Sequence, residues 1–159
     1  MCRSIGVFMK SLLCCLYMVC ALQVQAQERG TADEAKALVT KGLDHVKAVG
    51  LEKAMKDFTE NTDGKWRSKD LYLFANNFSG LMLAHGTNKA LVGQDTLALK
   101  DGSGKEFVKE MIAIAKDKGT GWVDYTFTDP VTKKLMPKSG YIARVSGQDA
   151  LLGVGVVKQ

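Results

Sequence analysis

The sequence predicts an α+β fold in which an antiparallel sheet of about five strands packs against helices. Glycines, aromatics and polar residues alternate at 121–128, 134–145 and 150–158, as is typical of strands joined by short turns. Apolar residues recur at three- and four-residue steps at 31–49 and 105–118, as in amphipathic helices. Because hairpins dominate, we expect an antiparallel sheet with the helices gathered on one face or end.

Residues 1–26 are typical of an export signal. Arg3 and Lys10 give a positive start, residues 11–22 are apolar, and Ala26 ends a small-residue site for a signal peptidase. The apolar run falls short of the roughly 20 residues that span a bilayer. We therefore expect cleavage after Ala26 and a periplasmic or secreted single domain at 27–159, with an uncleaved membrane anchor as the alternative.

The cysteines and the charge exclude several classes of function. All four cysteines lie in the leader, so the remaining chain offers no disulfide, thiolate metal site or cysteine nucleophile. The formal net charge of +5 is modest, and the lysines alternate with acidic residues along the chain. No basic stripe results, and no nucleic-acid partner is expected.

The first part of the domain reads as two helices. Thr31 can cap the helix at 31–49, and Glu34 stands at the capping-box spacing. Gly50 ends this long amino-terminal helix, and a second, short helix is predicted at 51–58. A polar loop follows before the first strand.

Strands then alternate with one further helix. Residues 71–76 read as a strand with apolar side chains on both faces, and 81–85 as the strand returning from a hairpin. Residues 88–92 suit a helical turn, and the helix at 105–118 follows a glycine-rich turn. This helix therefore lies between the second and third strands, and the three remaining strands complete the sheet.

Catalytic signatures are missing from the sequence. His45 and His85 are the two side chains that titrate near neutrality, and they are too few and too distant for a zinc site. His45 lies among polar neighbours on the amino-terminal helix, where we expect it to face solvent. No nucleophile elbow, phosphate loop or zinc-protease motif occurs. We expect no enzymatic activity.

Two neighbouring strands combine aromatic side chains with one cation. Trp122 and Tyr125 lie on one of them, and Lys138 and Tyr141 lie on the next. Aromatic walls with one ammonium group suit a pocket for a small carboxylate. Trp122 and Tyr125 have opposite parity, so one of the two belongs to the core. For Lys138, the alternative is a lysine at a sheet edge or on a solvent face.

A second pair of aromatics lies on the first long strand. Tyr72 and Phe74 share a parity and therefore a face of the sheet. They are candidates for the same pocket, and plain core packing is the alternative.

These residues belong to motifs that resemble a known family. From residue 31 to the end, the chain resembles a single Cache domain, an extracellular sensor module with a PAS-like fold. The matching stretches include 70–74 (DLYLF), 82–86 (MLAHG), 88–93 (NKALVG), 121–125 (GWVDY), 137–141 (PKSGY) and 153–156 (GVGV). Relatives often have Ser at Gly140 and Tyr at Val157, and these two differences would change the size of the pocket.

The resemblance implies a pocket on the sheet for small organic acids, amino acids or similar metabolites. It implies that the ligand-binding residues are Tyr72, Phe74, His85, Trp122, Tyr125, Lys138 and Tyr141. Cache domains usually stand in receptors, and this chain ends at Gln159 directly after its last strand. We therefore expect a free-standing module whose signal passes through another protein, such as a membrane receptor.

Three functions remain open at this point. The first is a binding or sensing module for a short organic acid, without catalysis or cofactor. The second is a sensor that holds haem through His85, since PAS-like folds can host cofactors. The third is an interaction subunit of a receptor or membrane complex whose pocket is vestigial.

Overall fold

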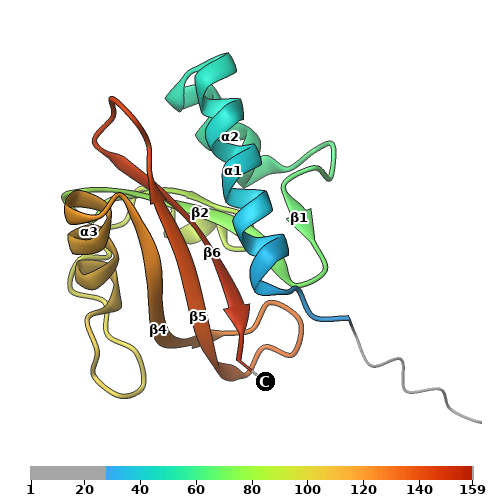
Figure 1. Cartoon of the computed structure of the whole chain (residues 1–159). Coiled ribbons are helices and arrows are strands. Elements are labelled where there is room, and N and C mark those ends of the chain that lie inside the picture. Colours follow the sequence, from blue (N-terminus) through green and yellow to red (C-terminus); the bar gives the residue numbers. More distant parts are fainter. Residues whose placement is uncertain (1–27, 159) are drawn as a thin grey trace, which may run out of the picture.

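A curved antiparallel sheet forms the centre of the protein, in a computed structural model that describes residues 28–158 (Figure 1). The strands are β1 (Arg67–Ser68), β2 (Leu71–Asn77), β3 (Met82–His85), β4 (Thr120–Thr128), β5 (Leu135–Arg144) and β6 (Ala150–Val157). They pair in the order β1-β2-β6-β5-β4, and β3 pairs with β2. The predicted antiparallel α+β fold is confirmed, with six strands because the two-residue β1 is too short to leave a sequence pattern.

Helices cover both faces of this sheet. Helix α1 (Ala32–Val49) lies across one face, and α2 (Leu51–Glu60) packs beside it (Figure 1). Helix α3 (Phe107–Asp117) packs on the opposite face against β4 and β5, and a short 3₁₀ helix, η1 (Lys89–Leu91), follows β3. The expectation that the helices gather on one face or end of the sheet was therefore wrong, because α3 has its own apolar stripe and buries it on the second face.

The amino-terminal helix starts where its capping residues predict. The Thr31 hydroxyl accepts from the backbone N–H of Glu34 at 3.2 Å, and the Glu34 carboxylate accepts from the backbone N–H of Thr31 at 2.8 Å. This reciprocal pair satisfies two of the free N–H groups at the helix start. Gly50 ends the helix with a φ of +85°, a conformation that favours glycine.

Strand alternation divides the apolar side chains into two cores. The core under α1 and α2 includes Leu38, Val39, Phe58, Trp66, Leu71, Leu73, Leu152 and Val154. The core under α3 includes Phe74, Met82, Phe107, Met111, Val123, Tyr125, Ile142 and Leu151. A polar side chain with the parity of the second set is therefore held between the sheet and α3.

His45 is more enclosed than its neighbours in sequence predict. Its ring lies 4.6 Å from that of Trp66 and 5.8 Å from that of Phe58, and its Nε2 is 2.8 Å from an oxygen of Asp57. The predicted solvent-facing position was wrong, because α2 packs along α1 with Asp57 and Phe58, and the segment after α2 places Trp66 against the ring.

The amino-terminal leader falls outside the described residues, and so does the predicted cleavage after Ala26. Within residues 28–158, no helix combines the length and apolar character needed to cross a bilayer.

Candidate functional site

A small cavity lies between the sheet and α3, lined by side chains from β2, β3, β4, α3 and the segment before α3. Its volume is about 30 Å³. The lining side chains are mostly apolar or aromatic: Tyr72, Phe74, Asn76, Met82, His85, Leu99, Phe107, Val108, Met111, Tyr125 and Phe127. Space of this size holds about one water molecule.

Lys138 lies beside this cavity and is fully buried. Its strand, β5, runs between β4 and β6, so the alternative of an edge or solvent-facing lysine is wrong. Nζ has no hydrogen-bond partner and is the one fully buried side-chain nitrogen or oxygen of residues 28–158 that lacks one. It lies 5.2 Å from the centre of the Tyr72 ring, which also lines the cavity. A buried ammonium group without a hydrogen-bond partner has the charge and the free donors that an anion requires.

Two carboxylates support the charge of Lys138 from a distance. Burial lowers the pKa of Lys138, and the negative charges of Asp129 and Asp70 oppose that change. Neither carboxylate bonds to Nζ, because both are already used elsewhere. The three donor positions of the ammonium group therefore remain available to a ligand.

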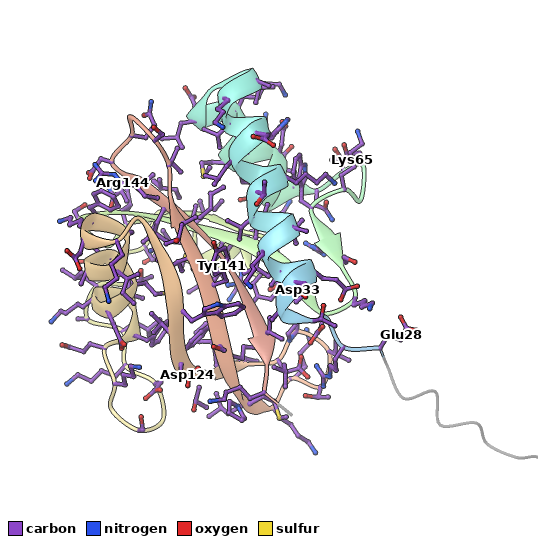
Figure 2. The ribbon with its side chains drawn as sticks, viewed as in Figure 1. Glu28, Asp33, Lys65, Asp124, Tyr141 and Arg144 are labelled. Atoms are coloured by element: carbon purple, nitrogen blue, oxygen red, sulfur yellow. The ribbon has the colours of Figure 1, made fainter. Side chains whose placement is uncertain are left out.

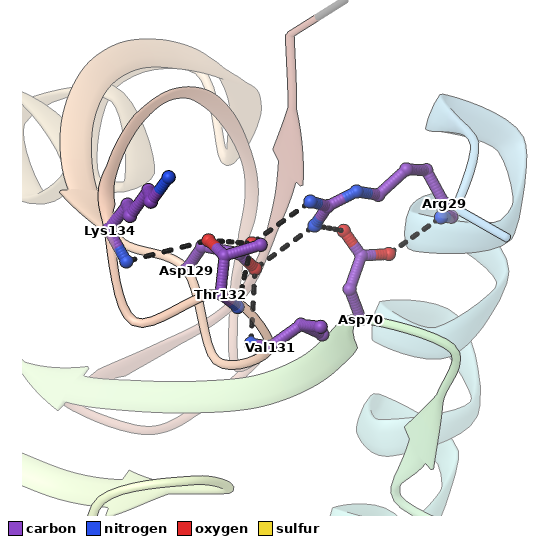
Figure 3. Close-up of polar contacts among 7 residues, drawn as sticks. Arg29, Asp70, Asp129, Val131, Thr132 and Lys134 are labelled. Carbon is purple, nitrogen blue, oxygen red and sulfur yellow. Dashed lines mark hydrogen bonds and ion pairs between the residues drawn. The ribbon is translucent and has the colours of Figure 1, made fainter. Parts of the chain in front are cut away.

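These two carboxylates belong to a network around Arg29 (Figure 3). The Arg29 guanidinium donates to both oxygens of Asp129 at 3.0 Å and to Asp70 at 3.1 Å. Asp70 also accepts from the backbone N–H of Gly30 at 2.7 Å, and Asp129 accepts from the Thr132 hydroxyl at 2.7 Å. The network joins the segment before α1 to the start of β2 and the end of β4.

His85 contributes a second polar group to the cavity. The backbone N–H groups of Thr87 and Asn88 donate to its Nδ1 at 3.3 and 3.0 Å. Nδ1 is therefore an acceptor, and the neutral ring carries its proton on Nε2. Burial and the charge of Lys138 lower the pKa of His85 to about 4. Near neutral pH, His85 thus offers one N–H donor without adding charge.

The depressed pKa of His85 predicts a loss of stability in mild acid. The pKa of His85 falls from its ordinary value of 6.5 in the unfolded chain to about 4 in the folded protein. Between these two pH values the unfolded chain therefore binds the proton while the folded protein does not. Stability should be complete above pH 6.5 and fall as the pH drops toward 4. Thermal unfolding of His85→Gln across this range should show a flatter profile than the wild type, and equal slopes would contradict the buried, neutral ring.

Aromatic rings form the walls around Lys138 and His85. The Tyr72 ring centre lies 4.9 Å from that of His85, and Phe127 lies 6.4 Å from His85 on the other side. Tyr125 stacks on Phe107 with centres 4.8 Å apart. Burial raises the pKa of Tyr72 to about 12, so its hydroxyl stays protonated. The site thus combines donors with apolar walls and presents no negative side chain among its lining residues.

Five of the seven candidate residues come together here: Tyr72, Phe74, His85, Tyr125 and Lys138. Trp122 and Tyr141 do not. Their ring centres lie 5.1 Å apart across β4 and β5, and both side chains pack against the core under α1, on the opposite face of the sheet. Figure 2 shows Tyr141 on this face, beside α1. The opposite parity of Trp122 and Tyr125 places them on opposite faces: Tyr125 is buried at the cavity, and Trp122 packs, partly buried, against the core under α1.

Other lining residues were missed by the sequence analysis. Phe127 shares the parity of Tyr125 on β4, which could have indicated it. Phe107 and Met111 were assigned only to the inward stripe of α3, and nothing in that stripe shows that it faces a cavity. Their role depends on where α3 docks.

A larger hollow lies elsewhere and has a different character. A groove of about 630 Å³ runs between α2 and β3, with Leu51, Met55, Leu83 and Val92 along it. It is open and largely apolar, and no buried charge lines it. The buried His85 ring lines the smaller cavity instead, and the buried ammonium group of Lys138 lies 5.2 Å from the centre of the Tyr72 ring that also lines it. Residues 28–158 also contain no group of three His, Cys, Asp or Glu side chains placed to hold a metal ion.

Comparisons with known proteins identify the family of this antiparallel α+β fold. Residues 31–158 match the Cache domain family, and the chain belongs to that family. The predicted resemblance is confirmed over nearly the whole described part of the chain.

One curated relative and one solved structure are methyl-accepting chemotaxis proteins. The methyl-accepting chemotaxis protein McpP of Pseudomonas putida is 30% identical over 87 residues, which are 55% of this chain and 16% of that protein. The chain thus spans less than a fifth of this relative. A methyl-accepting chemotaxis protein from Vibrio parahaemolyticus has the same fold, with a TM-score of 0.66 at 23% identity over 79% of this chain and 86% of its own.

A further solved structure is described as the basis for carboxylic acid recognition by a Cache chemosensory domain. It is 27% identical, with a TM-score of 0.62, and covers 80% of this chain and 88% of its own.

Proposed function

We propose that this protein is a periplasmic or secreted sensor domain that binds a short carboxylate without chemically changing it. The observation that carries the proposal is the Lys138 ammonium group, which is buried and without a hydrogen-bond partner beside a cavity. A ligand carboxylate would supply the missing acceptors, and charge-assisted hydrogen bonds of this kind are the strong ones.

His85 and the aromatic walls complete the recognition. The Nε2–H of His85 can donate to the second carboxylate oxygen of the ligand. The rings of Tyr72, Tyr125 and Phe127 contact its short carbon chain. The similar domain that recognises carboxylic acids supports this ligand class. The chemotaxis proteins similar to this chain support a sensory role. In this role a membrane receptor or signalling protein would detect the ligand-bound form.

The haem alternative has less support. A cavity of about 30 Å³ is far smaller than a porphyrin, and a cofactor of that size would have to displace several aromatic walls. The purified protein provides a direct check, because bound haem would give it a red colour and a Soret band.

The ligand class can be tested with matched pairs of compounds. We expect acetate, propionate, lactate and pyruvate to raise the melting temperature of the purified protein, because a ligand that binds only the folded state stabilises it. Acetamide and propionamide have the same shape without the charge and should leave it unchanged. Calorimetric titration should give one site per chain. Equal effects of acids and amides, or conversion of any of the acids to a product, would contradict the proposal.

A further inference from the structure

Two buried aspartates interact with two different cations. Asp70 lies directly before β2 and Asp129 directly after β4, and both side chains are fully buried. Arg29 donates hydrogen bonds to both of them (Figure 3), whereas Nζ of Lys138 bonds to neither. Burial lowers the pKa of Lys138, the charges of both aspartates oppose this change, and the charge of Arg29 adds to it. The four charged groups therefore act on one another.

The aspartates are also joined to the candidate site through the chain. Asp70 is followed two residues later by Tyr72, whose ring centre lies 5.2 Å from Nζ of Lys138. Phe127, which lines the cavity, stands two residues before Asp129. A shift of either aspartate is therefore transmitted to a side chain of the site through two residues of backbone.

The balance of charge gives the sign of this coupling. Within the group, the positive charges of Arg29 and Lys138 match the negative charges of Asp70 and Asp129. A carboxylate bound to Lys138 adds one negative charge, so the aspartates then depend on Arg29 for their compensation. Because charges interact strongly where water is excluded, release of Arg29 costs more free energy in the bound state than in the free state.

We propose that Arg29 and Gly30 form a latch on Asp70 and Asp129 that is linked to ligand binding, so that a carboxylate at Lys138 tightens the latch and the closed latch favours the carboxylate. This inference rests on the proposed function. Such linkage is reciprocal, and both effects have the same factor. The latch residues lead directly into α1, which lies across the sheet (Figure 1). Ligand binding therefore changes how firmly the start of α1 is held.

The Gly30 amide gives a direct measure of the latch. Its N–H donates to Asp70 at 2.7 Å, so its hydrogen exchange, followed by NMR, requires the latch to open. Saturating propionate should slow this exchange by about fivefold or more. The Gly50 amide, which donates to the Val46 carbonyl at the other end of α1, reports general stabilisation and should slow less.

Substitutions at Arg29 test the same linkage from the other side. In calorimetric titration with propionate, Arg29→Gln should bind about fivefold or more weakly than the wild type. Arg29→Lys keeps the positive charge and should recover most of the affinity, which a merely structural role of the two-armed guanidinium would not predict. Lys69→Met is the matched control and should bind like the wild type, because Lys69 pairs with Glu28 and Glu34 and with neither buried aspartate.

A measurement without ligand separates this inference from the proposed function. Lys138→Met removes the positive charge that a carboxylate would neutralise, so it should slow Gly30 exchange relative to Gly50 with no acid present. If no acid binds the wild type and this substitution still slows Gly30 exchange, the coupling stands and carboxylate recognition fails. Unchanged Gly30 exchange in Lys138→Met overturns the latch. So does propionate that binds the wild type without slowing Gly30, or that binds Arg29→Gln as tightly as the wild type.

Discussion

Replacing Asp129 with alanine should lower the free energy of unfolding by about 3–5 kcal/mol, the usual loss when one partner of a buried ion pair is removed. The Asp129 side chain is fully buried and holds the Arg29 guanidinium through two hydrogen bonds (Figure 3). Its loss would leave that cation without its main partner and the Thr132 hydroxyl without its acceptor. Urea unfolding of the purified variant would measure the change.

A second aspartate provides the matched control. Asp33 also forms an ion pair, at 3.6 Å from Lys36, but its side chain is 96% exposed whereas that of Asp129 is 0% exposed. Asp33→Ala should change the unfolding free energy by less than about 1 kcal/mol. Similar losses in both variants would show that the network around Arg29 does not stabilise the fold.

The same network predicts how the Asp129 effect depends on pH. Burial alone would raise the pKa of Asp129, but hydrogen bonds from Arg29, Thr132 and the backbone outweigh it and hold this pKa well below its usual range. A depressed carboxyl pKa gives stability that is complete above the unfolded value, near about 3.9, and is lost below it. The gap between wild type and Asp129→Ala should therefore be constant at neutral pH and narrow in acid.

Lys138→Met should abolish carboxylate binding and leave the protein at least as stable as the wild type. Methionine keeps the length of the side chain and removes the charge that the carboxylate needs. Removing one partner of a buried charge pair weakens binding by about 2–5 kcal/mol, or roughly 30-fold or more. Isothermal titration with propionate would measure the loss.

The expected stability of Lys138→Met follows from the absence of hydrogen bonds to Nζ of Lys138 in the wild type. Burial of the ammonium group disfavours folding, and the attraction of Tyr72, Asp129 and Asp70 offsets only part of it. We expect Lys138→Met to raise the unfolding free energy by about 1 kcal/mol or more. Lys109→Met, at an exposed position on α3 beside Glu106, is the control and should alter neither binding nor stability.

The sign of the pH dependence gives an independent check on Lys138. Burial lowers its pKa in the folded state, so the wild type gains stability as the pH rises toward the unfolded value, near about 10.4. Lys138→Met has no such group, and its stability advantage over the wild type should shrink as the pH rises toward the unfolded value. A variant that is less stable than the wild type at pH 7, or that still binds propionate with wild-type affinity, would remove Lys138 from the site.

The sequence determined much of this protein through local rules. Periodicity placed the helices and the main strands, and the Thr31 and Glu34 spacing located the start of α1. Strand parity also separated Trp122 from Tyr125 and grouped Tyr72 with Phe74, because successive side chains of a strand point to opposite faces. Parity could not say which of the two faces contains the cavity.

Only the tertiary structure decided which face of the sheet contains the cavity and which side chains are buried there. Helix α3 docks over the face that carries Lys138, so this lysine is enclosed while Tyr141, three residues later, packs under α1. The pairing of Gly140 with Gly155 lets Tyr125 settle on the sheet, and Arg29 meets Asp129 across a hundred residues of sequence. A sequence pattern reports which face of its own element a residue occupies, whereas burial and partners depend on which distant segment covers that face.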